Sequence, residues 1–182
     1  MPDILQAVKN LVGSFVDDEP KPPLHIGEAM SCWTYITAIA ESLTYEQIGL
    51  NMTTDPELRD ALHEAMKMCD SQVRRIRDFM EIEGVTSPPL SEPKPKSDPS
   101  AVPNGVKLTD DEIANGVSIK VAAAIVACAS AAAQSIRNDV NVMWLELQQE
   151  QMTYGISLKR LMRKRGWLKT PPFYVPPGLP IQ

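Results

Sequence analysis

The sequence has few of the residues that most reaction chemistry needs. Its 182 residues include two histidines and three cysteines, and aromatic residues make up 5% of the chain. Cys32, Cys69 and Cys128 lie far apart without a Cys-x-x-Cys pair, so a thiolate zinc site is not predicted. Their odd number and wide spacing predict reduced, buried thiols of the kind found in cytosolic proteins. We find neither a glycine-rich phosphate loop nor a Ser-His-Asp pattern.

Positive charge and long apolar runs are also scarce. The chain has 18 Lys and Arg against 23 Asp and Glu, a net charge of −5, and phosphate binding requires a basic surface, so no nucleic acid partner is predicted. The longest apolar run, residues 121–133, is shorter than the roughly 20 residues that span a bilayer, so no membrane span is predicted. Asp3 and Lys9 do not fit a secretory signal peptide.

The sequence is rich in helical periodicity. Apolar residues recur at steps of three and four in four long segments, at residues 24–52, 56–83, 109–137 and 138–165. Asp55 caps the second segment ahead of a proline, and Thr109 with Glu112 has the spacing of a capping box. Gly84 and Gly166 follow helix ends. Since no segment alternates with a period of two, the fold is predicted to be all-α.

Apolar stripes predict the buried face of each helix. The first stripe consists of Ile26, Met30, Trp33, Ile36, Ala40, Leu43 and Leu50. The second consists of Leu58, Leu62, Ala65, Cys69, Val73, Ile76 and Met80. The fourth consists of Val140, Met143, Trp144, Leu147, Tyr154, Leu158 and Leu161. The third helix is rich in alanine, so it needs close neighbours on several sides.

A proline-rich connection, residues 84–108, separates the two helix pairs. An extended segment rises about 3.1 Å per residue, so this one can run the full length of a helix. Short connections make the helices of each pair antiparallel neighbours, and one long central crossover is typical of a ferritin-like four-helix bundle. Two separate helical hairpins are the alternative, but two helices alone cannot bury four apolar stripes. We therefore predict one bundle domain at residues 24–182.

Both ends of the chain are predicted to lie outside the bundle. In the N-terminal segment, residues 1–23, a short amphipathic helix is expected, with an apolar face made of Leu5, Val8, Val12 and Phe15. The tail, residues 166–182, is extended and holds Phe173 and Tyr174 between prolines. We expect both to pack against the bundle or against a neighbouring subunit.

The order of helix pair, proline-rich crossover, helix pair and tail resembles a known family. With "EGVTSPP" after the second helix and "RGWLKTPPFYVPP" after the fourth, residues 24–177 resemble the ferritin-like proteins of spore-forming bacteria related to coat F spore coat proteins. The resemblance implies a ferritin-like bundle, self-association and a place in or near the spore coat, and therefore a cytoplasmic or spore-associated location. It implies no known reaction.

A ferritin-like bundle invites a test for a di-iron site. Such a site takes one Glu from each of two helices and a Glu-x-x-His from each of the other two. Only His25 and His63 are present, and His63 follows Asp60 in a degenerate Asp-x-x-His near a helix end. The third helix has no carboxylate after Glu112, and the fourth has no histidine. The sequence therefore predicts that the usual di-iron ligands are missing.

A polar level remains in the predicted core. Its members are Gln72, Glu150, Gln151 and Tyr154, with Glu41 and Lys120 as further candidates. They can form a degenerate metal or small-ligand pocket, or a buried hydrogen-bond network that fixes the helix register; we favour the network. Asp60 and His63 are a weaker candidate pair and more typical of a surface.

These observations predict a non-enzymatic structural or assembly protein without catalytic residues, cofactor or metal. Its expected partners are copies of itself, in a homodimer or larger assembly, and spore coat proteins. The alternative is a ferritin-like binding protein whose core holds iron, another divalent metal or a small ligand.

Overall fold

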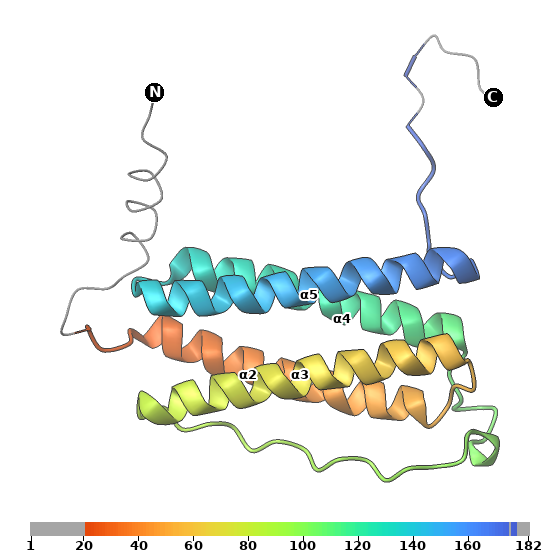
Figure 1. Cartoon of the computed structure of the whole chain (residues 1–182), viewed down its shortest axis with the longest axis horizontal. Coiled ribbons are helices and arrows are strands. Elements are labelled where there is room, and N and C mark those ends of the chain that lie inside the picture. Colours follow the sequence, from red (N-terminus) through yellow and green to blue (C-terminus); the bar gives the residue numbers. More distant parts are fainter. Residues whose placement is uncertain (1–20, 175, 178–182) are drawn as a thin grey trace.

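The computed structural model describes residues 21–174 and 176–177, and these contain no strand. Four long helices and one short 3-10 helix follow in order, namely α2 (Ile26–Leu50), α3 (Pro56–Ile82), η1 (Pro99–Ala101), α4 (Asp110–Gln134) and α5 (Asn138–Arg165) (Figure 1). The all-α prediction is confirmed. The predicted amphipathic face of residues 5–15 lies outside the described residues, as do residues 175 and 178–182 of the tail.

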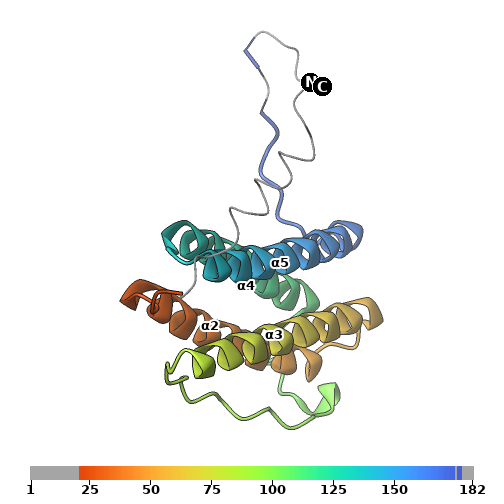
Figure 2. The ribbon, with the colours of Figure 1, turned by 60° about the vertical axis from the view of Figure 1, so that its left-hand side comes forward.

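The helices form two antiparallel pairs stacked as two layers (Figures 1 and 2). The pair α2 and α3 lies against the pair α4 and α5, with α2 in contact with α4 and α3 in contact with α5. Because the crossover returns the chain to the opposite end, α3 and α4 run in the same direction (Figure 1). This is the topology of a ferritin-like bundle, as predicted.

The proline-rich crossover runs along the outer side of the α2–α3 layer (Figure 2). The end of α2 holds it in place: Gln47 Oε1 accepts the backbone N–H of Lys94 at 2.7 Å, and Asn51 Oδ1 accepts that of Ser97 at 3.0 Å. The amide of Asn51 also donates to the Pro95 carbonyl at 2.9 Å. The segment therefore lies on the bundle as a strap.

Local capping explains where the helices begin and end. Asp55 accepts the N–H of Leu58 at 2.9 Å, and Thr109 with Glu112 forms a capping box, as predicted. His25 caps α2, since its Nδ1 accepts the N–H of Gly27 at 3.0 Å. Gly166 ends α5 with a φ of 73°, a conformation that favours glycine.

The predicted stripe of α3 is buried from Leu58 to Met80, but the first half of the predicted stripe of α2 is wrong. Ile26, Met30 and Trp33 are 86%, 59% and 42% exposed. The face that α2 buries instead repeats at steps of three and four through residues of mixed polarity, namely Glu28, Cys32, Tyr35, Ile39, Ser42, Glu46 and Gly49. At Gly49 an added Cβ would lie 3.0 Å from Ile113 of α4 and 3.2 Å from Leu62 of α3, so α2 approaches both neighbours closely on this face.

Aromatic contacts fill the space between the layers. The ring of Tyr35 meets that of Trp144 edge to face, with centroids 5.3 Å apart. Tyr45 lies across α4 at Gly116, where an added Cβ would fall 2.1 Å from the phenol oxygen, so no larger residue fits there without rearrangement. Lys120 Nζ stands 5.0 Å from the centre of the Tyr45 ring. In the tail, Phe173 and Tyr174 are exposed and pack in no groove of this bundle.

One end of the bundle is closed by Arg137, whose side chain is 4% exposed. Its guanidinium donates two hydrogen bonds of 2.7 Å to the carboxylate of Glu83 at the end of α3 and two more, of 3.0 and 2.7 Å, to Asp139. These bonds hold the pKa of Asp139 well below its usual range. The group also lies over the Phe79 ring.

A second buried charge completes this closure. Glu28 of α2 is 3% exposed, and its Oε1 accepts the backbone N–H groups of Ile136 at 2.9 Å and Arg137 at 3.1 Å. The turn between α4 and α5 is therefore bonded to both helices of the other pair.

Replacing Arg137 with alanine tests the importance of this closure. The change leaves Glu83 and Asp139 without their shared cation, although Lys21 still pairs with Asp139 at 3.0 Å. Breaking a fully buried ion pair costs roughly 3–5 kcal/mol, and both carboxylates are partly exposed, so we expect urea denaturation to show a smaller loss, of about 2 kcal/mol, in the free energy of unfolding. The matched control is Arg77→Ala, because Arg77 is exposed on α3 and such changes usually stay within about 0.5 kcal/mol. Equal losses in the two variants would contradict the role of Arg137.

Candidate functional site

The predicted polar level exists in the middle of the bundle, centred on Gln72 of α3, which has no exposed surface. Gln72 Oε1 accepts the hydroxyl of Tyr35 at 2.8 Å and the amide of Gln151 at 3.0 Å. Its Nε2 donates to the Leu147 carbonyl at 3.3 Å and to Glu150 Oε2 at 2.9 Å. The amide therefore links three helices, α2, α3 and α5.

Glu150 connects this core network to the surface. The same Oε2 that accepts from Gln72 also accepts a hydrogen bond from Arg75 Nη2 at 2.6 Å. Glu146 Oε2 lies 3.8 Å from Arg75 Nη1. With one oxygen engaged by both an amide and a guanidinium, the Glu150 carboxylate is held as part of the network.

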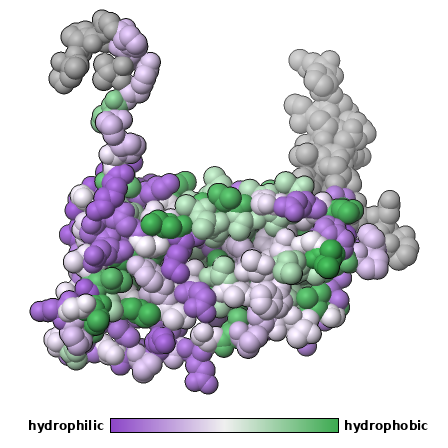
Figure 3. Space-filling view, turned by 180° about the vertical axis from the view of Figure 1, so that it is seen from behind, coloured by the Kyte–Doolittle hydropathy of each residue, from purple (hydrophilic) through white to green (hydrophobic). Residues whose placement is uncertain are grey.

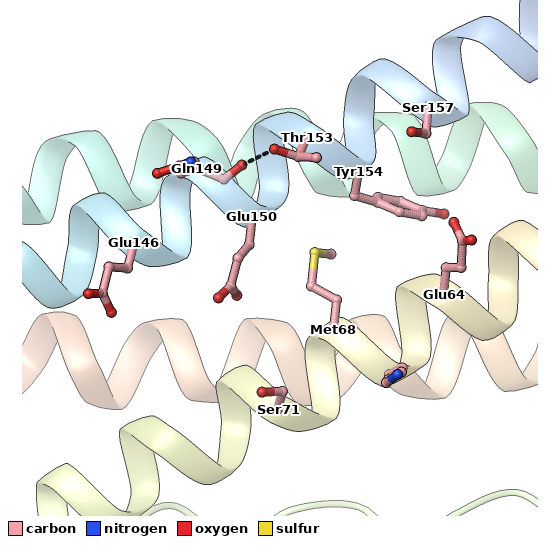
Figure 4. A pocket seen from close by; sticks show the side chains of 10 residues that line it. Glu64, Met68, Ser71, Glu146, Gln149, Glu150, Thr153, Tyr154 and Ser157 are labelled. Atoms are coloured by element: carbon pink, nitrogen blue, oxygen red, sulfur yellow. Dashed lines mark hydrogen bonds between the residues drawn. The ribbon is translucent and has the colours of Figure 1, made fainter.

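A groove between α3 and α5 lies beside this network and has a volume of about 660 Å³. Figure 4 shows Glu146 and Glu150 reaching into it from α5, with Met68 between the two helices. The complete lining consists of Glu64, Lys67, Met68, Ser71, Glu146, Gln149, Glu150, Thr153, Tyr154 and Ser157. The groove is open, and its polar groups are mostly carboxylates and hydroxyls.

Tyr154 was predicted to share a polar level with Gln72, Glu150 and Gln151, but it does not join their hydrogen-bond network. Its hydroxyl donates to the Ala61 carbonyl at 3.1 Å, and Figure 4 shows its ring extending toward Glu64. Burial raises the pKa of Tyr154, so the phenol is held in its neutral form.

The other candidates lie apart from the core. Asp60 and His63 are both exposed on α3, as expected of a surface pair, and no hydrogen bond or ion pair joins them in the described part of the chain. Glu41 is exposed and accepts the Ser91 hydroxyl of the crossover at 3.3 Å, so its assignment to the core level was wrong. Lys120 is half-buried beside Tyr45.

The sequence analysis missed two buried carboxylates, Glu28 at the end of the bundle and, in its core, Glu46, which is 2% exposed. Its Oε1 accepts the Cys69 thiol at 3.8 Å, and its Oε2 is buried without a hydrogen-bond partner. Burial raises the pKa of Glu46 from 4.5 to about 8, an effect that the charge of Lys120 opposes. A cavity of about 10 Å³, room for roughly one water molecule, adjoins it and is also lined by Ser42, Cys69, Lys120 and Gln151.

All three cysteines are buried free thiols, as predicted. Burial raises the pKa of Cys32 to about 12 and that of Cys128 to about 11. The pKa of Cys69 is raised as well, first by burial and then by the neighbouring Glu46. None of these thiols has the exposure or the lowered pKa of a nucleophile.

Comparison with known proteins places this bundle in a family. The family model "Protein of unknown function (DUF3231)" matches residues 15–178. The chain belongs to this family. It is 29% identical over 153 residues to the uncharacterized protein YvdQ of Bacillus subtilis (strain 168), a match that covers 84% of this chain and 90% of that protein.

Solved structures agree with this assignment. A crystal structure of a "putative spore coat protein" from Bacillus halodurans C-125 is 28% identical, with a TM-score of 0.83 over 85% of this chain and 97% of that one. The resemblance to ferritin-like proteins of spore-forming bacteria is thereby confirmed. A second solved structure is that of a two-domain protein from Anabaena variabilis with DJ-1/ThiJ/PfpI-like and ferritin-like domains. The match covers 97% of this chain and 52% of that one, at 13% identity and a TM-score of 0.62, so it shows the fold alone.

A DUF3231 chain with a ferritin-like fold must be tested against the di-iron centre that such folds can hold. Among the described residues, no group of three or more His, Cys, Asp or Glu side chains could hold a metal ion. At mid-height of the core, Glu46 is buried beside a thiol, while Gln72 and Gln151 stand where carboxylate or imidazole ligands would be needed. These residues do not fit a di-iron centre.

The raised pKa of Glu46 predicts a pH dependence of stability. Between pH 4.5 and about 8 the folded chain binds a proton at Glu46 that the unfolded chain has released, so the free energy of unfolding falls as pH rises. The slope is at most about 1.4 kcal/mol per pH unit. The variant Glu46→Gln cannot ionise, so we expect it to gain stability over the wild type from pH 5 to pH 8 in urea denaturation.

The exposed Glu41→Gln provides the control, and its curve should run parallel to that of the wild type. A difference between Glu46→Gln and the wild type that stays constant with pH would show that Glu46 is not held neutral.

Proposed function

We propose that this protein is a non-enzymatic structural or assembly protein of the spore coat type, which acts by associating with copies of itself. The observation that carries the proposal is the composition of its core. At the level where a ferritin-like protein would hold its metals, the Gln72 amide has all of its hydrogen-bonding groups engaged by Tyr35, Gln151, Leu147 and Glu150. Such a network supports a rigid scaffold.

The surface supports the same proposal. Large apolar side chains are exposed on the outer sides of three helices, among them Met30 and Trp33 of α2, Ile119 and Val126 of α4 and Ile156 of α5. Surfaces of this kind commonly mark sites of protein association. The name of the Bacillus halodurans relative gives the context, and on that ground we propose a spore-associated location with other coat proteins as further partners.

Binding of a metal or small ligand in the core is the second candidate. It is favoured by Glu46, whose Oε2 is buried without a partner beside a small cavity. Cys69 and Gln151 line the same cavity, so a ligand there would meet a carboxyl, a thiol and an amide.

Metal content and mass in solution distinguish the two functions. The full chain is expressed with iron, manganese and zinc supplied, and the purified protein is analysed by elemental mass spectrometry and by light scattering after size exclusion. We expect less than about 0.1 metal per chain, since three protein ligands are the usual minimum for a tight site, together with a mass of two or more chains.

The binding function would replace the scaffold proposal if the wild type held about one metal ion per chain. This metal would have to be lost in Glu46→Gln or Glu150→Ala and kept in the exposed control Glu41→Gln. A metal-free monomer at high protein concentration would contradict both self-association and metal binding.

A further inference from the structure

Helix α4 is apolar on every side over much of its length. No charged residue occurs in α4 after Lys120, and residues 121–134 span about 21 Å at 1.5 Å per residue. A helix that is apolar all round is normally buried. In this bundle, however, only 33% of the most apolar 18-residue stretch of α4 is buried. The outer side of α4 therefore lacks the charged face that a solvent-facing helix usually carries.

The exposed part of α4 forms a regular seam. Ile119 and Val126 are 69% and 67% exposed. With three alanines that are also exposed they follow steps of three and four, as Ile119, Ala122, Val126, Ala129 and Ala133. Such spacing is that of helices which pack along their length. This α4 seam lies on the opposite side of the helix from the buried positions Val117, Val121, Ala124 and Cys128.

Exposed apolar side chains of α5 extend the seam. Gln148 donates to the carbonyl of Ile125, which precedes Val126 of the seam, at 3.3 Å, so this side of α5 lies against α4. Leu145 and Met152 are three and four residues from Gln148, hence on the same side, and they are 42% and 48% exposed. Seen from behind, the surface carries a broad apolar band along the layer of α4 and α5 (Figure 3).

The pattern of the seam is complementary to itself. Val126 lies midway between Ile119 and Ala133, so an antiparallel copy centred on Val126 places each Ile119 against a small Ala133. At the intermediate levels Ala122 meets Ser130, and Ala129 meets Ala123, which lets the two backbones approach closely. The two Lys120 side chains would lie about 18 Å apart along the axis, too far to repel each other strongly at physiological salt.

We propose that α4 pairs antiparallel with α4 of a second copy, about a two-fold axis at Val126. This assignment rests on the self-association proposed above and names the surface that performs it. A two-fold interface must use the same patch on both copies, and the α4 seam meets that condition.

Two other occupants of the seam are less well supported. By length and composition alone α4 could cross a membrane, but in this bundle its other side packs against α5 and α2. Its first turn carries Asp110, Asp111 and Glu112, which anionic lipid would repel. The chain's own residues 1–20, which lie outside the described residues, are the other candidate. Both occupants are outcomes of the experiment below.

Cross-linking at the two-fold axis tests the geometry. In Val126→Cys the two new thiols face each other, close enough for the short Cβ–Cβ distance of a disulfide. Under mild oxidation we expect disulfide-linked dimers from this variant. None should form from Asp78→Cys, which is exposed on α3, or from the wild type, whose own thiols are buried.

A charge at the same position tests the energetics. Val126→Glu places two carboxylates against each other at the axis, and we expect the dissociation constant of the dimer to rise about 100-fold or more by sedimentation equilibrium. Thr153→Glu is the matched control, because Thr153 is exposed on α5 and lines the groove that faces α3. Circular dichroism melting should show both variants folded, since both sites are at the surface.

The outcomes separate this proposal from the one on which it rests. Self-association that survives Val126→Glu, without cross-linking of Val126→Cys, would overturn the seam but leave the assembly function intact. A monomeric wild type would overturn both. If the protein is a monomer and Val126→Cys reacts slowly with a soluble maleimide, the seam is covered within the chain, and we would assign it to residues 1–20. If the monomer floats with phosphatidylcholine vesicles, we would assign the seam to a lipid surface.

Discussion

At one end of the bundle a single cation, the guanidinium of Arg137, joins the two layers. It binds Glu83 at the end of α3 with two hydrogen bonds of 2.7 Å, while the backbone at the same turn donates to Glu28 of α2. The turn between α4 and α5 is thus fixed to both members of the other pair. These bonds fix the position of the α4–α5 turn relative to α2 and α3, and so contribute to the register in which the polar and aromatic groups of the interior meet.

That register places the interior hydrogen bonds. Leaving one buried polar group unpaired costs roughly 1–3 kcal/mol, so Gln72 tolerates few alternative positions of α2 and α5. A ferritin-like fold can thus keep a polar centre without keeping metal ligands, because amides supply donors and acceptors without charge. Glu46 is the exception, since it is buried with an unpartnered oxygen and a raised pKa, and it makes the centre sensitive to pH rather than merely rigid.

Sequence alone predicted the features that are set locally. The Asp55 and Thr109 caps depend on nearby residues, and the α3 stripe is consistent because its apolar residues are large and its outer face is charged. The inner face of α2 could not be found in this way, since Trp33 and Met30 are larger and more apolar than the Cys32 and Ser42 that lie inside. Glu41, a further candidate for the polar level, lies on the exposed side of the same helix, whereas Glu46 lies inside. The steps of three and four from Cys32 through Ile39 to Gly49 were the available signal, but only contact with Trp144 and Gly116 reveals which side of α2 faces the core.

The buried thiols have a consequence for the chemistry of the folded molecule. With pKa values of about 12 for Cys32 and 11 for Cys128, less than about one molecule in a thousand carries either thiolate at neutral pH. The native fold is therefore inert toward disulfide exchange and mild oxidants. Any natural disulfide formed by these cysteines would record a chain that had opened, which makes their oxidation state a marker of folding history.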